Sequence, residues 1–207
     1  MAEIEYWFSA HSAFAYLGSA RFREIADAAR AKVIYRPYDL DRVVEAVSMV
    51  PFAKRTMAHK RYYFQREIDR WAQYRNAPVC GFRPTHHDNS TALCNGMLIA
   101  ALHAGLEIHP LAHAMLQAHW RDNADLADSA TLEALARGVG LEPAPLLEGA
   151  LSPEVQAEYE RNTTEALERP IFGSPTYVVD GDMFYGQDRL EMVERALQAP
   201  FSRNWKT

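Results

Sequence analysis

Residues 172–185 decide the fold, and they read Phe-Gly-Ser-Pro-Thr-Tyr-Val-Val-Asp-Gly-Asp-Met-Phe-Tyr. Residues 176–179 are rich in β-branched and aromatic side chains, which predicts a strand. Asp180-Gly181 is a strong signal for a two-residue hairpin turn, and residues 183–185 predict the returning strand. The C-terminal part of the chain is therefore expected to contain a β-hairpin.

Pro175 opens the first strand of this hairpin, where a proline cannot donate a hydrogen bond to the sheet. We expect a cis peptide bond between Ser174 and Pro175, which would turn the backbone of Ser174 outward and leave its N–H and C=O free. Such a backbone edge can pair with an extended ligand. The alternative is an ordinary trans proline at the start of a strand.

The N-terminal part of the chain predicts a strand, a helix and a second strand. Residues 3–8 alternate, with every second side chain apolar, and apolar residues recur at helical spacing from Phe14 to about residue 30. Residues 32–38 predict the second strand, and residues 190–197 predict a closing helix. The order βαβ…ββα is that of an α/β protein with a thioredoxin-like fold.

A large helical segment separates these two halves. We expect residues 1–40 and 168–207 to form the thioredoxin-like domain, and residues 41–167 to form an inserted all-helical domain. Within the insertion, the pattern of apolar residues predicts helices over 55–76, 90–105, 110–120, 129–139 and 152–167.

Composition excludes several classes of protein. The 207 residues are 48% hydrophobic and 24% charged, with a net charge of −5, so nucleic acid is not an expected partner. No apolar run reaches the roughly 18 residues that a membrane helix needs. The N-terminus carries acidic residues where a secretory signal has Lys or Arg, so we expect a cytoplasmic protein with no membrane partner. Cys80 and Cys94 form no CxxC motif, which disfavours a disulfide oxidoreductase; we interpret both as structural thiols.

Ser12 lies just before the first predicted helix. The N–H groups and the dipole at a helix N-terminus favour an anion, and in redox thioredoxins a cysteine thiolate occupies this place. Ser12 can help stabilise a thiolate brought by a ligand, or it can be only a helix cap. His11 adjoins it, and either orients or deprotonates a bound thiol or is a plain loop residue.

Other histidines have the spacing of metal ligands but lack the pattern of a metal site. His109 and His113 are four residues apart, without the glutamate of an H-E-x-x-H motif. His86 and His87 precede an aspartate in a predicted loop. We expect no metal at either place.

Four segments together resemble the 2-hydroxychromene-2-carboxylate isomerases, relatives of the kappa-class glutathione transferases and of the DsbA-like oxidoreductases. The resemblance covers essentially the whole chain. The segments are Ser-Ala-Phe-Ala-Tyr-Leu at 12–17, Asp-Arg-Trp-Ala-Gln at 69–73, Phe-Gly-Ser-Pro-Thr at 172–176 and Gly-Gln-Asp-Arg-Leu at 186–190.

The resemblance implies a glutathione-dependent isomerase, a homodimer, that acts on an aromatic oxo-acid by reversible addition of the glutathione thiolate. Ser12 matches the serine that meets the glutathione sulfur. Ser174, before the cis-proline Pro175, matches the residue that pairs with the cysteinyl backbone. Asp188, with Gln187 as its neighbour, matches the residue that holds the γ-glutamyl end. A carboxylate there would accept a charge-assisted hydrogen bond from the glutathione ammonium.

Some residues have a second interpretation or depart from the family. Asp188 and Glu191 have the spacing of a capping box for the last helix. Ala13 follows Ser12 where the family usually has proline. Lys54 stands near the place of a frequent asparagine, and it can meet a carboxylate of glutathione or of the substrate.

The basic residues between 54 and 75 are expected to form a solvated helix face, although one or two of them can bind the carboxylate of an aromatic acid. Tyr62, Tyr63 and Trp71 can then wall an apolar pocket, but core packing is the favoured role for Trp71.

Two other functions fit the same segments. A kappa-like glutathione transferase would share the glutathione site and consume glutathione. A non-catalytic thioredoxin-fold module would bind a peptide at the cis-proline edge and would not bind glutathione.

Overall fold

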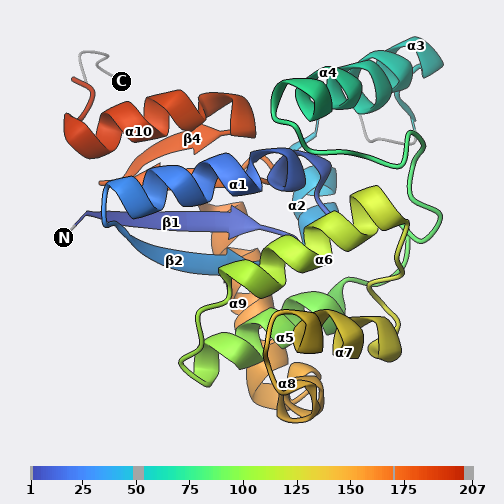
Figure 1. The fold of residues 1–207 in the computed structure, drawn as a ribbon. Coiled ribbons are helices and arrows are strands. Elements are labelled where there is room, and N and C mark those ends of the chain that lie inside the picture. The colour runs from blue at the N-terminus through green and yellow to red at the C-terminus, as the bar shows by residue number, and fades with distance from the viewer. Residues whose placement is uncertain (1, 49–53, 170, 203–207) are drawn as a thin grey trace.

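The computed structural model describes residues 2–48, 54–169 and 171–202, and at their centre lies a four-stranded sheet (Figure 1). The strand order is β2-β1-β3-β4, with β1 parallel to β2 and antiparallel to β3, and with β3 antiparallel to β4. The strands are β1 (Glu3–Phe8), β2 (Lys32–Pro37), β3 (Thr176–Val179) and β4 (Asp182–Tyr185). The predicted α/β thioredoxin-like fold is confirmed.

The hairpin between β3 and β4 forms at the predicted turn. Asp180 and Gly181 both have positive φ angles, of 50° and 73°. A two-residue turn of this kind needs left-handed backbone at both positions, and the Asp-Gly pair adopts it at low cost. The Ser174–Pro175 peptide bond is cis, as expected.

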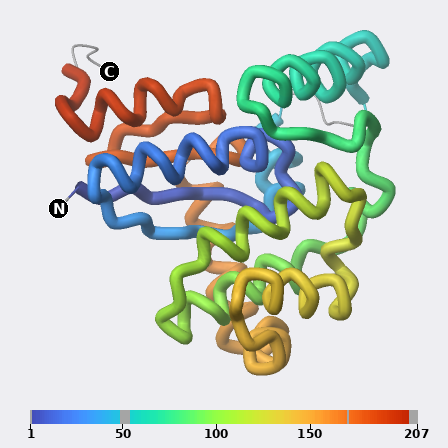
Figure 2. Tube along the Cα trace, viewed as in Figure 1, coloured from blue at the N-terminus to red at the C-terminus, as the bar shows by residue number. Residues whose placement is uncertain are grey.

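Helices cover both faces of the sheet, and the two ends of the chain meet in it (Figure 2). Helices α1 (Ala13–Ala28) and α10 (Leu190–Gln198) pack on one face, where Tyr6 stacks on Tyr177 with 5.3 Å between ring centroids. Side chains from α2 (Leu40–Val47) and α9 (Pro153–Glu168) cover Trp7 on the other face. Both faces are therefore buried, although the sequence of β1 indicated only one apolar face.

The remaining helices of the described ranges lie between α2 and α9, apart from a turn that precedes α10. They are α3 (Met57–Arg61), the π-helical turn η2 (Tyr62–Arg66), α4 (Glu67–Tyr74), α5 (Ala92–His103), α6 (His109–Asp122), α7 (Ser129–Gly138), α8 (Pro143–Ala150) and the 3-10 turn η3 (Gln187–Arg189).

In the described ranges, the sequence pattern missed two helices, α2 and α8, and two irregular turns, η2 and η3. Helices α2 and α8 are only eight residues long, too short for a clear periodicity. Helix α8 begins at Pro143, and proline fits a first turn because the N–H that it lacks is unpaired there in any case. The helix predicted over 55–76 is divided by η2.

One hydrophobic cluster joins the sheet to the helical segment. It includes Phe8 and Tyr16 from the N-terminal half and Met97, Leu111 and Met115 from α5 and α6. The division of the chain into two domains stays a prediction. Within the described ranges, no helix combines the length and the apolar character needed to cross a bilayer.

Candidate active site

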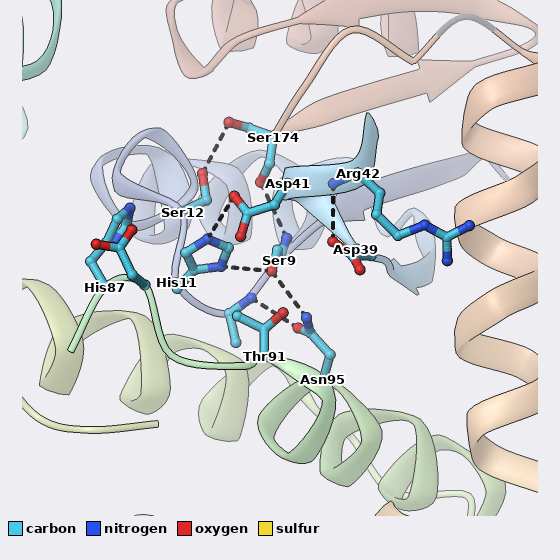
Figure 3. Close-up of polar contacts among 12 residues, drawn as sticks. Ser9, His11, Ser12, Asp39, Asp41, Arg42, His87, Thr91, Asn95 and Ser174 are labelled. Atoms are coloured by element: carbon cyan, nitrogen blue, oxygen red, sulfur yellow. Dashed lines mark hydrogen bonds and ion pairs between the residues drawn. The ribbon is translucent and has the colours of Figure 1, made fainter. Parts of the chain in front are cut away.

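Ser12 follows the end of β1 and is the N-cap residue of helix α1. Its hydroxyl accepts a hydrogen bond from the N–H of Ala15 at 3.2 Å, so the expected cap is present. The same hydroxyl donates to the carbonyl oxygen of Ser174 at 3.0 Å (Figure 3). A serine oxygen has two lone pairs, so Ser12 can still accept one hydrogen bond, but its proton is already used.

The backbone of Ser174 is less free than the sequence suggested. Its carbonyl accepts from Ser12, and its side-chain oxygen accepts from the N–H of Ser9 at 3.2 Å. The expectation of a free carbonyl is therefore wrong, because the donor hydroxyl of Ser12 lies within hydrogen-bond distance of it. The contact nevertheless brings together Ser12 and Ser174, which lie 162 positions apart in the sequence.

Side chains from the helical segment hold the loop between β1 and α1. Asn95 of α5 is fully buried; its Oδ1 accepts from the N–H of Ala10 and its Nδ2 donates to the hydroxyl of Ser9, both at 3.0 Å (Figure 3). The indole Nε1 of Trp120 donates to the carbonyl of His11 at 2.8 Å. Sequence reasoning missed Asn95, although an amide within the apolar helix predicted over 90–105 was a usable signal.

His11 makes contacts away from Ser12. Its Nδ1 lies 2.9 Å from the hydroxyl of Ser9, and its Nε2 lies 3.8 Å from Oδ1 of Asp41 in α2 (Figure 3). The neighbouring imidazole of His11 lowers the pKa of the Asp41 carboxyl. Ser9, His11 and Asp41 thus form a Ser-His-Asp arrangement, which the sequence analysis did not predict. Ser9 is fully buried, so this arrangement offers no accessible nucleophile for acyl transfer.

His87 and His119 extend this polar region. The Nδ1 of His87 lies 2.9 Å from the Nε2 of His119, and the Nδ1 of His119 lies 3.0 Å from the carbonyl of Ala124. Burial, reinforced by the neighbouring His11, lowers the pKa of His87 to about 3. Burial likewise lowers the pKa of His119 to about 4. Both rings are therefore neutral at pH 7. Among the described residues, no group of three or more His, Cys, Asp or Glu side chains has the arrangement of a metal site.

The two residues expected near the γ-glutamyl end lie in η3 but differ in exposure. Asp188 is exposed, whereas Gln187 is buried and its Oε1 accepts from Nε of Arg75 at 3.1 Å. The predicted capping box is wrong, because η3 precedes α10 and the cap position, Arg189, makes no side-chain cap bond. Glu191 instead pairs with Arg75 at 3.0 Å. The carboxylate of Asp188 is therefore not used as a helix cap.

The basic residues between 54 and 75 do not form one uniform face. Lys54 is exposed, in agreement with a solvated side chain, and its contact with a ligand stays a prediction. Arg75 departs from the expectation: its side chain is only 9% exposed because it bridges α4 to η3 and α10. Trp71 is half-buried against the core, and the guanidinium of Arg75 lies over its ring.

The cysteines lie in other surroundings. Cys94 is fully buried, and burial raises the pKa of its thiol to about 12. Cys80 is half-buried, with its sulfur 3.2 Å from the carbonyl of Phe82. Neither thiol takes the place of Ser12 at the N-terminus of α1.

An open groove of about 500 Å3 is lined by residues of β4, η3 and α10. Its lining is largely apolar and includes Phe172, Met183, Tyr185, Met192 and Phe201. Four of these side chains are more than a third exposed.

Comparison with known proteins agrees with the thioredoxin-like fold of this chain. The family described as DSBA-like thioredoxin domain matches residues 3–198. A 2-hydroxychromene-2-carboxylate isomerase from Sphingobium xenophagum is 28% identical, over 94% of this chain and 97% of its own. One from Pseudomonas putida is 27% identical, over 94% and 93%. A solved 2-hydroxychromene-2-carboxylate isomerase superposes with a TM-score of 0.76 at 25% identity, covering 95% of this chain and 94% of that chain. The resemblance read from the sequence is confirmed, and the chain belongs to the DSBA-like thioredoxin domain family.

Proposed function

We propose that this chain is a glutathione-dependent isomerase of an aromatic oxo-acid of the 2-hydroxychromene-2-carboxylate or trans-o-hydroxybenzylidenepyruvate type. The observation that carries the proposal is the hydroxyl of Ser12, which lies at the N-terminus of α1 and 3.0 Å from the carbonyl of Ser174. Relatives that match over 94% of this chain are named for this isomerisation, which supports the same reaction class here.

The residues at this site fit glutathione by their chemistry. The N–H groups and dipole at the start of α1 favour a thiolate over a thiol. The exposed carboxylate of Asp188 suits an ammonium group. Bound glutathione would supply a thiolate that adds reversibly to a conjugated double bond, so that the bond can rotate before the thiolate leaves.

Ser12 and Ser174 would act together when the ligand binds. The hydroxyl of Ser12 now donates its proton in a hydrogen bond to the carbonyl oxygen of Ser174. Rotation of the Ser12 hydroxyl would point this proton at the sulfur and release the carbonyl of Ser174 for a backbone N–H of the ligand. Ser12 is then a hydrogen-bond donor and not a nucleophile.

The test is calorimetric titration with reduced glutathione, with S-methylglutathione as a ligand that cannot form a thiolate. We expect binding of both, and thiolate absorption at about 240 nm with the first alone. A hydroxychromene-type acid is then added, and product and free thiol are counted. Isomerisation without loss of thiol supports the proposal.

The other outcomes select the rival functions. Stoichiometric loss of thiol would indicate a kappa-like transferase. Absence of binding at millimolar glutathione would contradict both enzymes and favour a peptide-binding module. We also propose that the protein is a cytoplasmic homodimer. Light scattering of the same sample would measure its oligomeric state.

A further inference from the structure

The backbone of Ser9 contacts both residues of the Ser12–Ser174 contact. Its N–H donates to the side-chain oxygen of Ser174 at 3.2 Å, and its carbonyl accepts from the N–H of Ser12 at 3.0 Å. Ser12 belongs to the N-terminal half of the fold and Ser174 to the C-terminal half. The position of Ser9 therefore sets how these two residues face each other.

The side chain of Ser9 is held by Asn95 and His11. The backbone N–H of Ala10 can only donate, so the Asn95 atom that accepts from it is Oδ1, and Nδ2 is the atom that donates to the hydroxyl of Ser9. The same hydroxyl lies 2.9 Å from Nδ1 of His11. With one lone pair of its oxygen used by Asn95, Ser9 still has its own proton and a second lone pair for His11.

The neighbour on the other side of the ring decides which of these Ser9 uses. Nε2 of His11 lies 3.8 Å from Oδ1 of Asp41 (Figure 3). An ionised carboxylate is an acceptor only, so the proton of the neutral imidazole is on Nε2, which faces it. Nδ1 is then the acceptor, and the hydroxyl of Ser9 donates to it.

His11 is placed to act through Ser9 and not on a ligand directly. Its side chain is buried, and the residue is only 3% exposed. Its backbone is held as well, because its carbonyl accepts from the indole of Trp120 at 2.8 Å. Ring and backbone are thus both fixed, and what His11 does at the site passes to it through the hydrogen bond with Ser9.

We propose that His11 is a positioning residue of the glutathione site, which accepts a hydrogen bond from the hydroxyl of Ser9 and so holds the backbone of Ser9 against Ser12 and Ser174. This assignment rests on the proposed function, because the contact that it positions is the one assigned there to the sulfur and the cysteinyl backbone of glutathione.

The test compares three substitutions of His11. The Oδ1 of asparagine can take the place of Nδ1 as an acceptor, the end of a glutamine side chain reaches only the place of Nε2, and leucine has no polar atom. His11→Asn should keep glutathione affinity within about 2-fold of the unchanged protein. His11→Gln and His11→Leu should each weaken it about 10-fold, because the hydrogen bond with Ser9 is lost. Calorimetry measures the affinity of each variant.

His113→Leu is the matched control. Nδ1 of His113 lies 3.0 Å from the hydroxyl of Ser19, so this variant loses an imidazole–hydroxyl contact of the same kind in the middle of α1. Its urea midpoint should fall, while its glutathione affinity should stay unchanged. If the two leucine variants lose affinity to the same extent, the effect is general destabilisation and the assignment is overturned.

Amide hydrogen exchange tests the assignment without glutathione. His11→Leu should speed the exchange of the Ser9 and Ser12 amides about 10-fold, and His11→Asn should not. Nitrogen NMR of the unchanged protein at about pH 8, where an ordinary imidazole is neutral, should find the ring proton of His11 on Nε2.

Four results would overturn the assignment. They are a ring proton on Nδ1, equal exchange in the asparagine and leucine variants, equal affinity in all three variants of His11, and a glutamine variant that keeps its affinity where the asparagine variant does not. If the unchanged protein does not bind glutathione, the proposed function fails by itself, while the exchange rates still decide whether His11 positions Ser9.

Discussion

Replacement of Asn95 by leucine should loosen the loop that carries Ser12. The buried N–H of Ala10 would lose its acceptor, which costs about 1–3 kcal/mol, and Ser9 would lose a donor, which costs about 1 kcal/mol more. Leucine is similar in size and regains part of this through apolar burial. We expect the free energy of unfolding to fall by about 2 kcal/mol, which lowers the Tm by roughly 4–8 °C in a chain of this size.

The assay is urea unfolding followed by tryptophan fluorescence, with glutathione titration of the folded variant. Asn89→Leu is the matched control, because Asn89 is exposed and its Nδ2 donates to Oδ2 of half-buried Asp125 at 2.9 Å. The control should change stability by less than about 0.5 kcal/mol. Asn95→Leu should also weaken glutathione binding, since Ser12 would no longer be held opposite Ser174. A stability loss below about 1 kcal/mol would refute the idea that Asn95 fixes the loop.

Three further predictions concern single side chains. Ser12→Ala should remove the helix cap and lower the free energy of unfolding by about 1 kcal/mol. It should also reduce turnover while largely keeping glutathione affinity. Unchanged turnover would show that Ser12 takes no part in the mechanism. Asp188→Asn should weaken glutathione binding in calorimetry without changing the urea midpoint, and equal affinity would exclude Asp188 as a ligand. Burial lowers the pKa of His119 from its ordinary value of 6.5 to about 4, so the neutral ring contributes stability that is fully present above pH 6.5 and is lost as the pH falls toward 4. His119→Gln should reduce the acid-induced loss of stability by at most roughly 1.4 kcal/mol per pH unit, and an identical pH profile would contradict this reasoning.

The parts of the fold that could be predicted depend on residues that lie close together in the sequence. The hairpin turn at Asp180-Gly181 requires left-handed backbone, which few residue pairs adopt easily, so two residues were enough to place it. The cap at Ser12 likewise depends on one side chain and an N–H three positions later. Signals of this kind need no knowledge of the rest of the chain.

The parts that could not be predicted depend on contacts between distant segments. Arg75 looked like one more solvated cation, but its partners in η3 and α10 are more than 100 positions away. The capping box at Asp188 failed for the same reason, because Glu191 is drawn to Arg75 and not to the helix start. Asn95 shows that an unexpected polar residue in an apolar helix is a usable signal, although its partner cannot be named from sequence alone.

At the start of α1 this chain has the serine hydroxyl of Ser12, where redox thioredoxins have a cysteine thiol, and this difference decides which chemistry the site can support. A cysteine at the place of Ser12 would gain from the helix dipole and become a reactive thiolate, whereas a serine hydroxyl stays protonated near pH 7. Of the two cysteines in the sequence, Cys94 has a pKa raised by burial to about 12, and Cys80 contacts the carbonyl of Phe82 in a different part of the molecule. The helix terminus therefore provides a field suited to a thiolate that the side chain at this position does not supply. Under the proposed function, a ligand that brings its own thiol would complete the site, which is why that function depends on glutathione binding.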